Sequence, residues 1–149
     1  MTPFKVMFLC TGNSARSQMA EGLARQMAGS KWEASSAGIE PKGVNPYTMR
    51  AMHEVGIDIS GHTSKPMDPD LLTRMDLIVT LCGDARDRCP ITPPRVRHLH
   101  WPIADPAAVR GTDEEIMRAF RDTREEIARR VRELLGTYGN TSLQDEPLR

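Results

Sequence analysis

Short apolar runs alternate along the chain with stretches in which apolar residues recur at helical spacing. A short apolar run that is buried on both faces is typical of a strand in a parallel sheet covered by helices on both sides. Four such runs are predicted to be strands, and they lie at Lys5–Leu9, Trp32–Ser36, Leu77–Leu81 and Val96–His100. The alternation predicts an α/β fold, a three-layer sandwich with a four-stranded parallel sheet flanked by helices.

Helix start signals and apolar spacing place helices between and after these strands. We expect them at Ser17–Ala28, at Pro46–Val55, from Asp68-Pro69 onward, and at Thr112–Leu135. Asp68 suits the N-cap and Pro69 the first helical position. Gly136 is expected to end the last helix, and the following residues have little apolar content. The pattern therefore predicts a single domain over residues 1–136 and a disordered tail over residues 137–149.

The composition limits the partners and the compartment. The 149 residues fit one domain, and 20 basic side chains balance 20 acidic ones. No global charge favours nucleic acid or an anionic membrane surface, so any anion binding must be local. The apolar stretch Val6–Cys10 is too short for a signal peptide or a membrane span, and we expect a cytoplasmic protein. Three cysteines in a reducing compartment favour redox or metal chemistry over static crosslinks.

The segment that follows the first predicted strand carries most of the functional information. Cys10 ends the apolar run, and Arg16 follows six residues later, where a helix is about to begin. In a strand, loop and helix of this kind, backbone N–H groups converge on a point to which the helix dipole adds positive charge. The arginine fork suits a tetrahedral oxyanion such as phosphate or arsenate. The predicted substrate-binding residues are Thr11, Gly12, Asn13, Ser14, Ala15, Arg16 and Ser17.

The same positive field would stabilise a thiolate at Cys10, and the Ser17 hydroxyl is placed to donate to the sulfur. Cys10 is therefore interpreted as a nucleophile beneath a bound oxyanion. The alternative is an inert buried cysteine beside a surface arginine, which is the usual situation of a lone cysteine. The coincidence of Gly12, the serines and the arginine spacing favours the nucleophile.

A second pair of cysteines follows the third predicted strand. Cys89 lies seven residues after Cys82, so a helical segment would place their α-carbons about 10 Å apart. A disulfide requires less than about 7 Å. Gly83 and Pro90 would allow the segment to unwind, and we predict a redox segment that changes shape on oxidation.

Two other interpretations of this cysteine pair stay open. Together with His98 and His100 the cysteines offer four zinc ligands, although paired ligands in structural sites usually lie two to four residues apart. The cysteines could also be two unconnected, partly buried thiols.

Asp105-Pro106 lies in the loop after the fourth predicted strand. An Asp-Pro step alone is commonly a turn. A thiolate that attacks an oxyanion, however, expels an oxygen that needs a proton, and a carboxylic acid at the mouth of the site can supply it. Because the carboxyl ends of parallel strands meet at one edge of the sheet, we expect Cys10, Cys82 and Asp105 to converge on one site.

Five segments together resemble the thioredoxin-coupled arsenate reductases, which share a fold with the low-molecular-weight tyrosine phosphatases, and the match extends from Lys5 to about Leu135. The segments are Cys10–Gly22, Ser36–Ile39, Val55–Ser60, Val79–Asp84 and Cys89–Pro94. The oxyanion loop alone does not separate the two families. Its combination with the later cysteine pair carries the resemblance.

The resemblance implies that Cys10 attacks arsenate, with Asp105 as proton donor and Arg16 and the loop amides holding the oxygens. Cys82 then attacks the Cys10 sulfur as arsenite leaves, and Cys89 attacks Cys82. The resulting Cys82 to Cys89 bridge is reduced by thioredoxin. No dinucleotide fingerprint is present, so we expect no bound cofactor and thioredoxin as the external reductant.

Two positions depart from the pattern of some relatives. Ala15 replaces a cysteine that the relay does not require. Lys65 stands where relatives that bind a monovalent cation have an aspartate, beside positions that match Asn13, Glu21 and Ser36. A lysine ammonium there repels a cation and itself supplies the positive charge, so we predict no potassium site and no other metal.

The alternative enzyme is a low-molecular-weight protein tyrosine phosphatase, which has no use for Cys82 and Cys89. Aromatic residues that would grip a phosphotyrosine ring are missing after Asp105-Pro106, where Ala107 and Ala108 follow. Weak phosphatase side activity is nevertheless expected, because arsenate and phosphate share shape and charge. A non-enzymatic oxyanion sensor is a further alternative, although no DNA-reading helix with a basic stripe is present.

Overall fold

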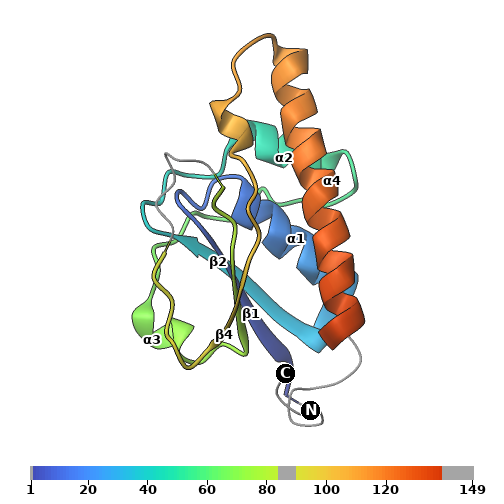
Figure 1. The fold of residues 1–149 in the computed structure, drawn as a ribbon. Coiled ribbons are helices and arrows are strands. Elements are labelled where there is room, and N and C mark those ends of the chain that lie inside the picture. Colours follow the sequence, from blue (N-terminus) through green and yellow to red (C-terminus); the bar gives the residue numbers. More distant parts are fainter. Residues whose placement is uncertain (1, 84–89, 139–149) are drawn as a thin grey trace.

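Four parallel strands form the sheet, in the spatial order β2-β1-β3-β4 (Figure 1). The computed structural model describes residues 2–83 and 90–138. The strands are β1 Phe4–Cys10, β2 Trp32–Gly38, β3 Leu77–Thr80 and β4 Arg97–His100. The helices are α1 Arg16–Ala28, α2 Pro46–His53, α3 Pro69–Leu72 and α4 Asp113–Tyr138, with single 3₁₀ turns η1 Gly29–Lys31 and η2 Pro106–Ala108. The predicted α/β fold with its four-stranded parallel sheet is confirmed.

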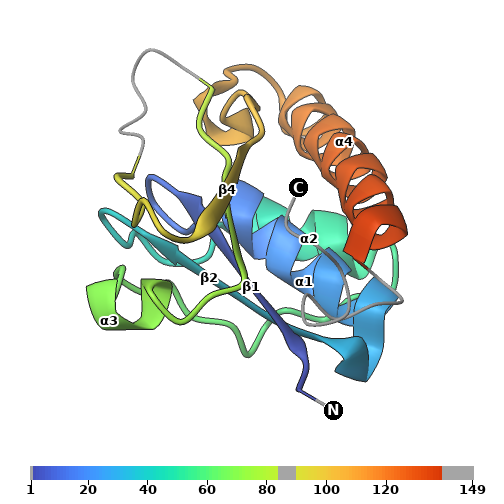
Figure 2. The same ribbon diagram turned by 60° about the horizontal axis from the view of Figure 1, so that its bottom comes forward.

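Helices cover the two faces of the sheet unequally. Figure 2 shows α1, α2 and α4 on one side of the strands and the short α3 on the other. Side chains alternate between the two faces along each strand. In β1, Val6 and Phe8 join the larger hydrophobic cluster under α1 and α4, whereas Met7 and Leu9 join the smaller cluster with Leu72 of α3. This two-sided burial explains why β1 has the near-continuous apolar run from which it was predicted.

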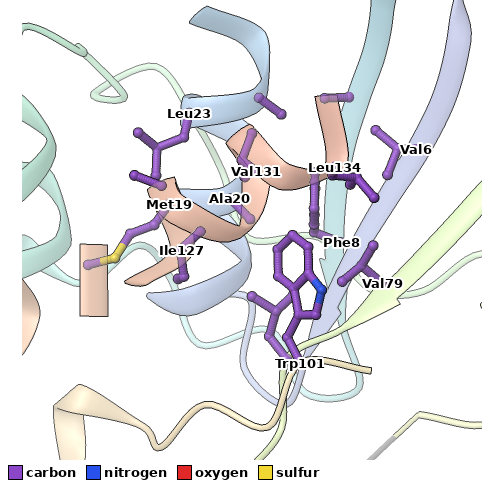
Figure 3. Close-up of a cluster of buried hydrophobic side chains, with 14 of the residues drawn as sticks. Val6, Phe8, Met19, Ala20, Leu23, Val79, Trp101, Ile127, Val131 and Leu134 are labelled. Carbon is purple, nitrogen blue, oxygen red and sulfur yellow. The ribbon is translucent and has the colours of Figure 1, made fainter. Parts of the chain in front are cut away.

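The larger cluster joins the helices to the strands that carry the site (Figure 3). The rings of Phe8 and Trp101 lie 5.9 Å apart between centroids, and both are buried. Ile127 and Val131 of α4 are fully buried in the same cluster. The segment after β4, which begins at Trp101, is thereby fixed against β1.

The last helix extends beyond its predicted end. α4 continues through Gly136 to Tyr138, although a glycine inside a helix costs about 1 kcal/mol relative to alanine. The Tyr138 ring stacks on Phe4 with 4.9 Å between centroids, and its hydroxyl accepts a 2.9 Å hydrogen bond from Arg97 Nη1. This packing offsets the cost, so the prediction that Gly136 ends the helix is wrong. The remainder of the predicted tail, residues 139–149, lies outside the described residues.

The carboxyl ends of the strands meet at the edge of the sheet where α2 lies in Figure 1. β1 pairs with β2 so that Cys10 stands opposite Gly38. On its other side, the Leu81 N–H just after β3 donates to the carbonyl of Leu9, at 2.8 Å. Cys82 therefore follows directly beside the end of β1. No helix in residues 2–83 and 90–138 is long and apolar enough to cross a membrane.

Candidate active site

The loop between β1 and α1 is held from outside through its carbonyl groups. Backbone N–H groups of Glu40, Lys42 and Asn45 donate to the carbonyls of residues 11, 12 and 14, at 2.9, 3.0 and 3.1 Å. In a planar trans peptide the N–H points away from the carbonyl. The N–H groups of Gly12 and Ala15 are therefore turned away from this outer segment, and both residues line a cavity. The α1 N-terminus follows at Arg16, which completes an anion cradle.

Asn13 supports the loop on the side away from the cavity. Its backbone adopts the left-handed conformation, with φ at 47°. Its side chain is fully buried and donates from Nδ2 to Ser17 Oγ at 2.8 Å. Its Oδ1 accepts from Gln18 Nε2 at 3.0 Å and from the Lys65 N–H at 2.9 Å. Asn13 and Ser17, two of the predicted substrate-binding residues, are absent from the cavity lining and serve as supports behind it.

Cys10 lies at the bottom of the cradle and is 2% exposed. Its Sγ lies 2.8 Å from Ser17 Oγ. Because Ser17 Oγ already accepts the Asn13 amide hydrogen, its own hydrogen is available to the sulfur. Ser17 therefore lies where a hydroxyl donor to the sulfur was predicted.

Arg16 and Asp105 connect the cradle to the loop that follows β4. Arg16 is 3% exposed, and its Nη1 donates to the carbonyl of Ile103 at 2.9 Å. Its Nη2 lies 3.9 Å from Asp105 Oδ2. The Asp105 side chain also accepts from the Ala107 N–H at 3.0 Å, so it caps η2. The Asp-Pro step is therefore both a turn and the position of a carboxyl group at the mouth of the site.

The cavity above Cys10 has a volume of about 590 Å³. The predicted residues Cys10, Thr11, Gly12, Ser14, Ala15, Arg16 and Asp105 all line it. Further lining residues come from the segment after β2 and from the turn after Asp105, and they include Lys42, Val44, Asn45, Ala107, Ala108 and Arg110. Sequence reasoning missed Lys42 and Arg110. The available signal was that each follows a strand end or turn already assigned to the site.

Cys82 is 4% exposed and disulfide-bonded, whereas Cys10 is a free thiol. Gly83 follows Cys82 in the chain. A Cβ at Gly83 would lie 2.7 Å from the backbone of Ile103, the residue whose carbonyl accepts a hydrogen bond from Arg16. Gly83 thus permits a close approach of the two backbones. Cys89 lies outside the described residues, and the shape change of its segment stays a prediction.

His98 and His100 both lie within hydrogen-bond distance of the same hydroxyl group. Thr80 Oγ1 lies 3.0 Å from His98 Nε2 and 2.8 Å from His100 Nδ1. Burial lowers the pKa of His98, which keeps its ring neutral at pH 7. Within residues 2–83 and 90–138, no group of three or more metal-ligating side chains occurs.

The Lys65 ammonium was predicted to take the place of a bound cation, and it lies beside a buried carboxylate. Its Nζ is 4.0 Å from Oε1 of Glu21, a carboxylate that is 2% exposed. Ser36 Oγ donates to the same oxygen at 2.6 Å, and Arg25 Nη2 lies 3.0 Å from Oε2. Burial lowers the pKa of neighbouring His62, so lysine and arginine balance the buried charge.

Comparisons with known proteins agree with this arrangement. The low molecular weight phosphotyrosine protein phosphatase family matches residues 5–147. Arsenate reductase of Bacillus subtilis is 54% identical over 132 residues, which is 89% of this chain and 95% of that protein. A solved arsenate reductase in a phosphate-binding state superimposes with a TM-score of 0.71 at 34% identity, covering 90% of this chain and 98% of that one.

A thioredoxin-dependent arsenate reductase of Corynebacterium glutamicum superimposes with a TM-score of 0.70 at 32% identity. The match covers 91% of this chain and 62% of the Corynebacterium chain. This chain therefore spans less than two thirds of that protein.

Gly38→Ala tests whether contact with the end of β2 shapes the cradle. A Cβ at Gly38 would lie 2.7 Å from the Asn13 backbone nitrogen and 2.8 Å from the Thr11 carbonyl oxygen, so the loop must move. We expect sulfate affinity, measured from the rise of Tm with sulfate, to fall by about tenfold or more. Gly61→Ala is the control, because its Cβ meets nothing within 4 Å. An unchanged sulfate response in Gly38→Ala would contradict this geometry.

Lys65→Asp tests the assignment of the lysine ammonium to the cation position. The natural chain should melt at the same temperature in potassium chloride and in sodium chloride of equal ionic strength. The variant should gain a potassium-dependent rise in Tm, because Glu21 keeps its charge while the lysine ammonium is gone. A tight, potassium-specific stabilisation of the natural chain would refute the prediction.

Proposed function

The chain belongs to the low molecular weight phosphotyrosine protein phosphatase family, and we propose that it reduces arsenate to arsenite through a relay of Cys10, Cys82 and Cys89. The proposal is carried by one observation. The free thiol in the oxyanion cradle and the disulfide-bonded Cys82 follow neighbouring strands of one sheet. A phosphatase uses only the first of these sulfurs. Similarity to arsenate reductases over nearly their whole length supports the same activity.

The first step is nucleophilic attack by Cys10 on bound arsenate. Its thiolate forms an S–As bond while an As–O bond breaks. Asp105, at the mouth of the cavity, protonates the departing oxygen, which leaves as water. Arg16 and the N–H groups of Gly12 and Ala15 hold the remaining oxygens, so the charge stays compensated throughout the step.

The second step transfers two electrons to arsenic. The Cys82 thiolate attacks Cys10 Sγ, an S–S bond forms, and the electron pair of the S–As bond leaves with the arsenic. Arsenic is thereby reduced from As(V) to As(III) and departs as arsenite. The pairing of β1 with β3 supports this exchange, because the two cysteines follow neighbouring strands and such strands lie about 5 Å apart.

The third step regenerates the cradle thiol. Cys89 attacks Cys82, so Cys10 is released and a Cys82 to Cys89 disulfide remains. We propose that the dithiol of thioredoxin reduces this disulfide and becomes oxidised in turn, which requires no bound cofactor. A dithiol reductant fits the reducing cytoplasm, where we place the reaction.

The cradle also supports weak hydrolysis of phosphate esters. Attack by Cys10 and protonation by Asp105 need no second cysteine, and a phosphoryl group matches arsenate in shape and charge. The turn after Asp105 offers Ala107 and Ala108 to the cavity and no ring to stack on a phosphotyrosine. We therefore assign phosphatase chemistry as a side activity.

Cys82→Ser separates the relay from the phosphatase chemistry. The variant should lose multi-turnover arsenate reduction coupled to thioredoxin, because no sulfur is left to attack Cys10. It should keep slow hydrolysis of an aryl phosphate, because the first step is untouched. Arsenite release and aryl phosphate cleavage are measured side by side.

Cys10→Ser is the matched variant, and it should lose both reactions. Thioredoxin-driven arsenate turnover at the natural rate in Cys82→Ser would overturn the relay. Loss of aryl phosphate hydrolysis in Cys82→Ser, with the fold intact, would contradict the separation of the steps.

A further inference from the structure

The wall of the cavity carries more positive charge than the cradle alone requires. Its charged lining residues are Arg16, Lys42, Arg110 and Asp105. Three cations and one carboxylate leave a net charge of two positive units, in a protein whose 20 basic and 20 acidic residues balance overall. Arg16 and Asp105 face each other at 3.9 Å and offset one another. The excess charge therefore belongs to Lys42 and Arg110.

Lys42 contacts the cradle at Gly12 through both its backbone and its side chain. Its backbone N–H donates to the Gly12 carbonyl at 3.0 Å. A Cβ at Gly12 would lie 3.3 Å from Lys42 Cδ and 3.4 Å from Lys42 Cγ, so the aliphatic stem crosses over this loop residue. The stem thus occupies the space that a side chain at position 12 would fill. Lys42 therefore lies against the part of the cavity wall that Gly12 forms.

Arg110 approaches the cavity from the turn after Asp105. It lines the cavity together with the small residues Ala107 and Ala108, so this turn contributes no bulky side chain to the lining beside it. Gly111, with φ at 145°, follows it and turns the chain toward the start of α4. Lys42 and Arg110 therefore lie on wall segments contributed by two different loops, after β2 and after β4.

We propose that Lys42 and Arg110 form a cationic rim that selects doubly charged tetrahedral oxyanions and admits them to Cys10. This inference rests on the proposed function and adds the specificity-determining residues. Arsenate carries two negative charges in neutral to mildly alkaline solution, equal to the excess on the wall. The product, arsenous acid, is uncharged under the same conditions. The cationic rim attracts the charged substrate, whereas the uncharged product offers no charge for the rim to attract.

The rim acts on binding and not on bond making. Long-range attraction by clustered charges raises the encounter rate and the local concentration of an oppositely charged ligand. Removing a rim charge lowers the association rate and weakens the salt dependence of binding. Neither cation is assigned to the reacting sulfur or to the departing oxygen. We therefore expect changes in KM and in the sulfate dissociation constant, with kcat preserved.

The test uses sulfate, a dianion that cannot be reduced, as the probe. In the full chain carrying Cys82→Ser and Cys89→Ser, only Cys10 reacts with the uncharged reagent iodoacetamide. The ratio of alkylation rates with and without sulfate gives the sulfate dissociation constant. Lys42→Met and Arg110→Met are compared with Lys31→Met and Arg74→Met. These controls remove equal charges from exposed positions just before the amino ends of β2 and β3, whereas the cavity lies at the carboxyl ends of the strands.

We expect each rim variant to weaken sulfate binding by about three- to tenfold, and the effect to shrink as potassium chloride is raised. The two controls should stay within twofold of the parent chain. In the chain with all three cysteines, the rim variants should raise the arsenate KM by a similar factor, while inhibition by arsenite stays unchanged. Rim variants that bind sulfate as well as the controls would overturn the proposal.

The two proposals fail in different ways. If the parent chain reduces no arsenate while its sulfate affinity still depends on Lys42 and Arg110, the rim stands and the arsenate assignment falls. If arsenate is reduced and the rim variants keep the parent sulfate constant and KM, the assignment stands and the rim falls. A loss of arsenite inhibition in the rim variants would also contradict selection by charge.

Discussion

The site depends on the backbone hydrogen bonds that hold the carbonyl groups of the β1 to α1 loop outward. Three N–H groups from residues 40, 42 and 45 hold these carbonyls, and the close passage of Gly38 leaves no room for the loop to relax. Peptide planarity then turns N–H groups toward the cavity above Cys10. Without these hydrogen bonds, the loop N–H groups would not be held toward the cavity beside Arg16 and the N-terminus of α1. The loop from β2 to α2 is therefore as important to the chemistry as the loop that carries the cysteine.

One chain of contacts links the oxyanion loop with the later cysteines. Arg16 binds the carbonyl of Ile103, and Gly83, next to Cys82, passes against the backbone of the same residue. The backbone at Gly83 therefore lies close to the segment that holds Arg16 and leads to Asp105. The second cysteine is thereby a structural neighbour of the cradle, as the proposed relay requires.

The pattern of apolar runs predicted the strands and the main helices, because both faces of the sheet are buried and β1 accordingly is apolar at every position except Lys5. It also predicted that Cys10 ends a strand and that Asp105 lies in the loop after the fourth strand. It failed at Gly136, where the stacking of Tyr138 on Phe4 overrides a local signal that the helix should end. It gave no sign that Asn13 and Ser17, both predicted to bind the substrate, also bond to each other. Such differences arise from tertiary contacts that no local window contains.

The most direct measurement of the relay is a single turnover of arsenate by the Cys89→Ser variant without any reductant, followed by peptide mass spectrometry under non-reducing conditions. The relay predicts arsenite in stoichiometric amount with the protein and a disulfide that joins Cys10 to Cys82, because the third sulfur is absent and the exchange stops there. Arsenite release with both cysteines still unlinked, or no arsenite from a folded variant that binds sulfate normally, would contradict the account.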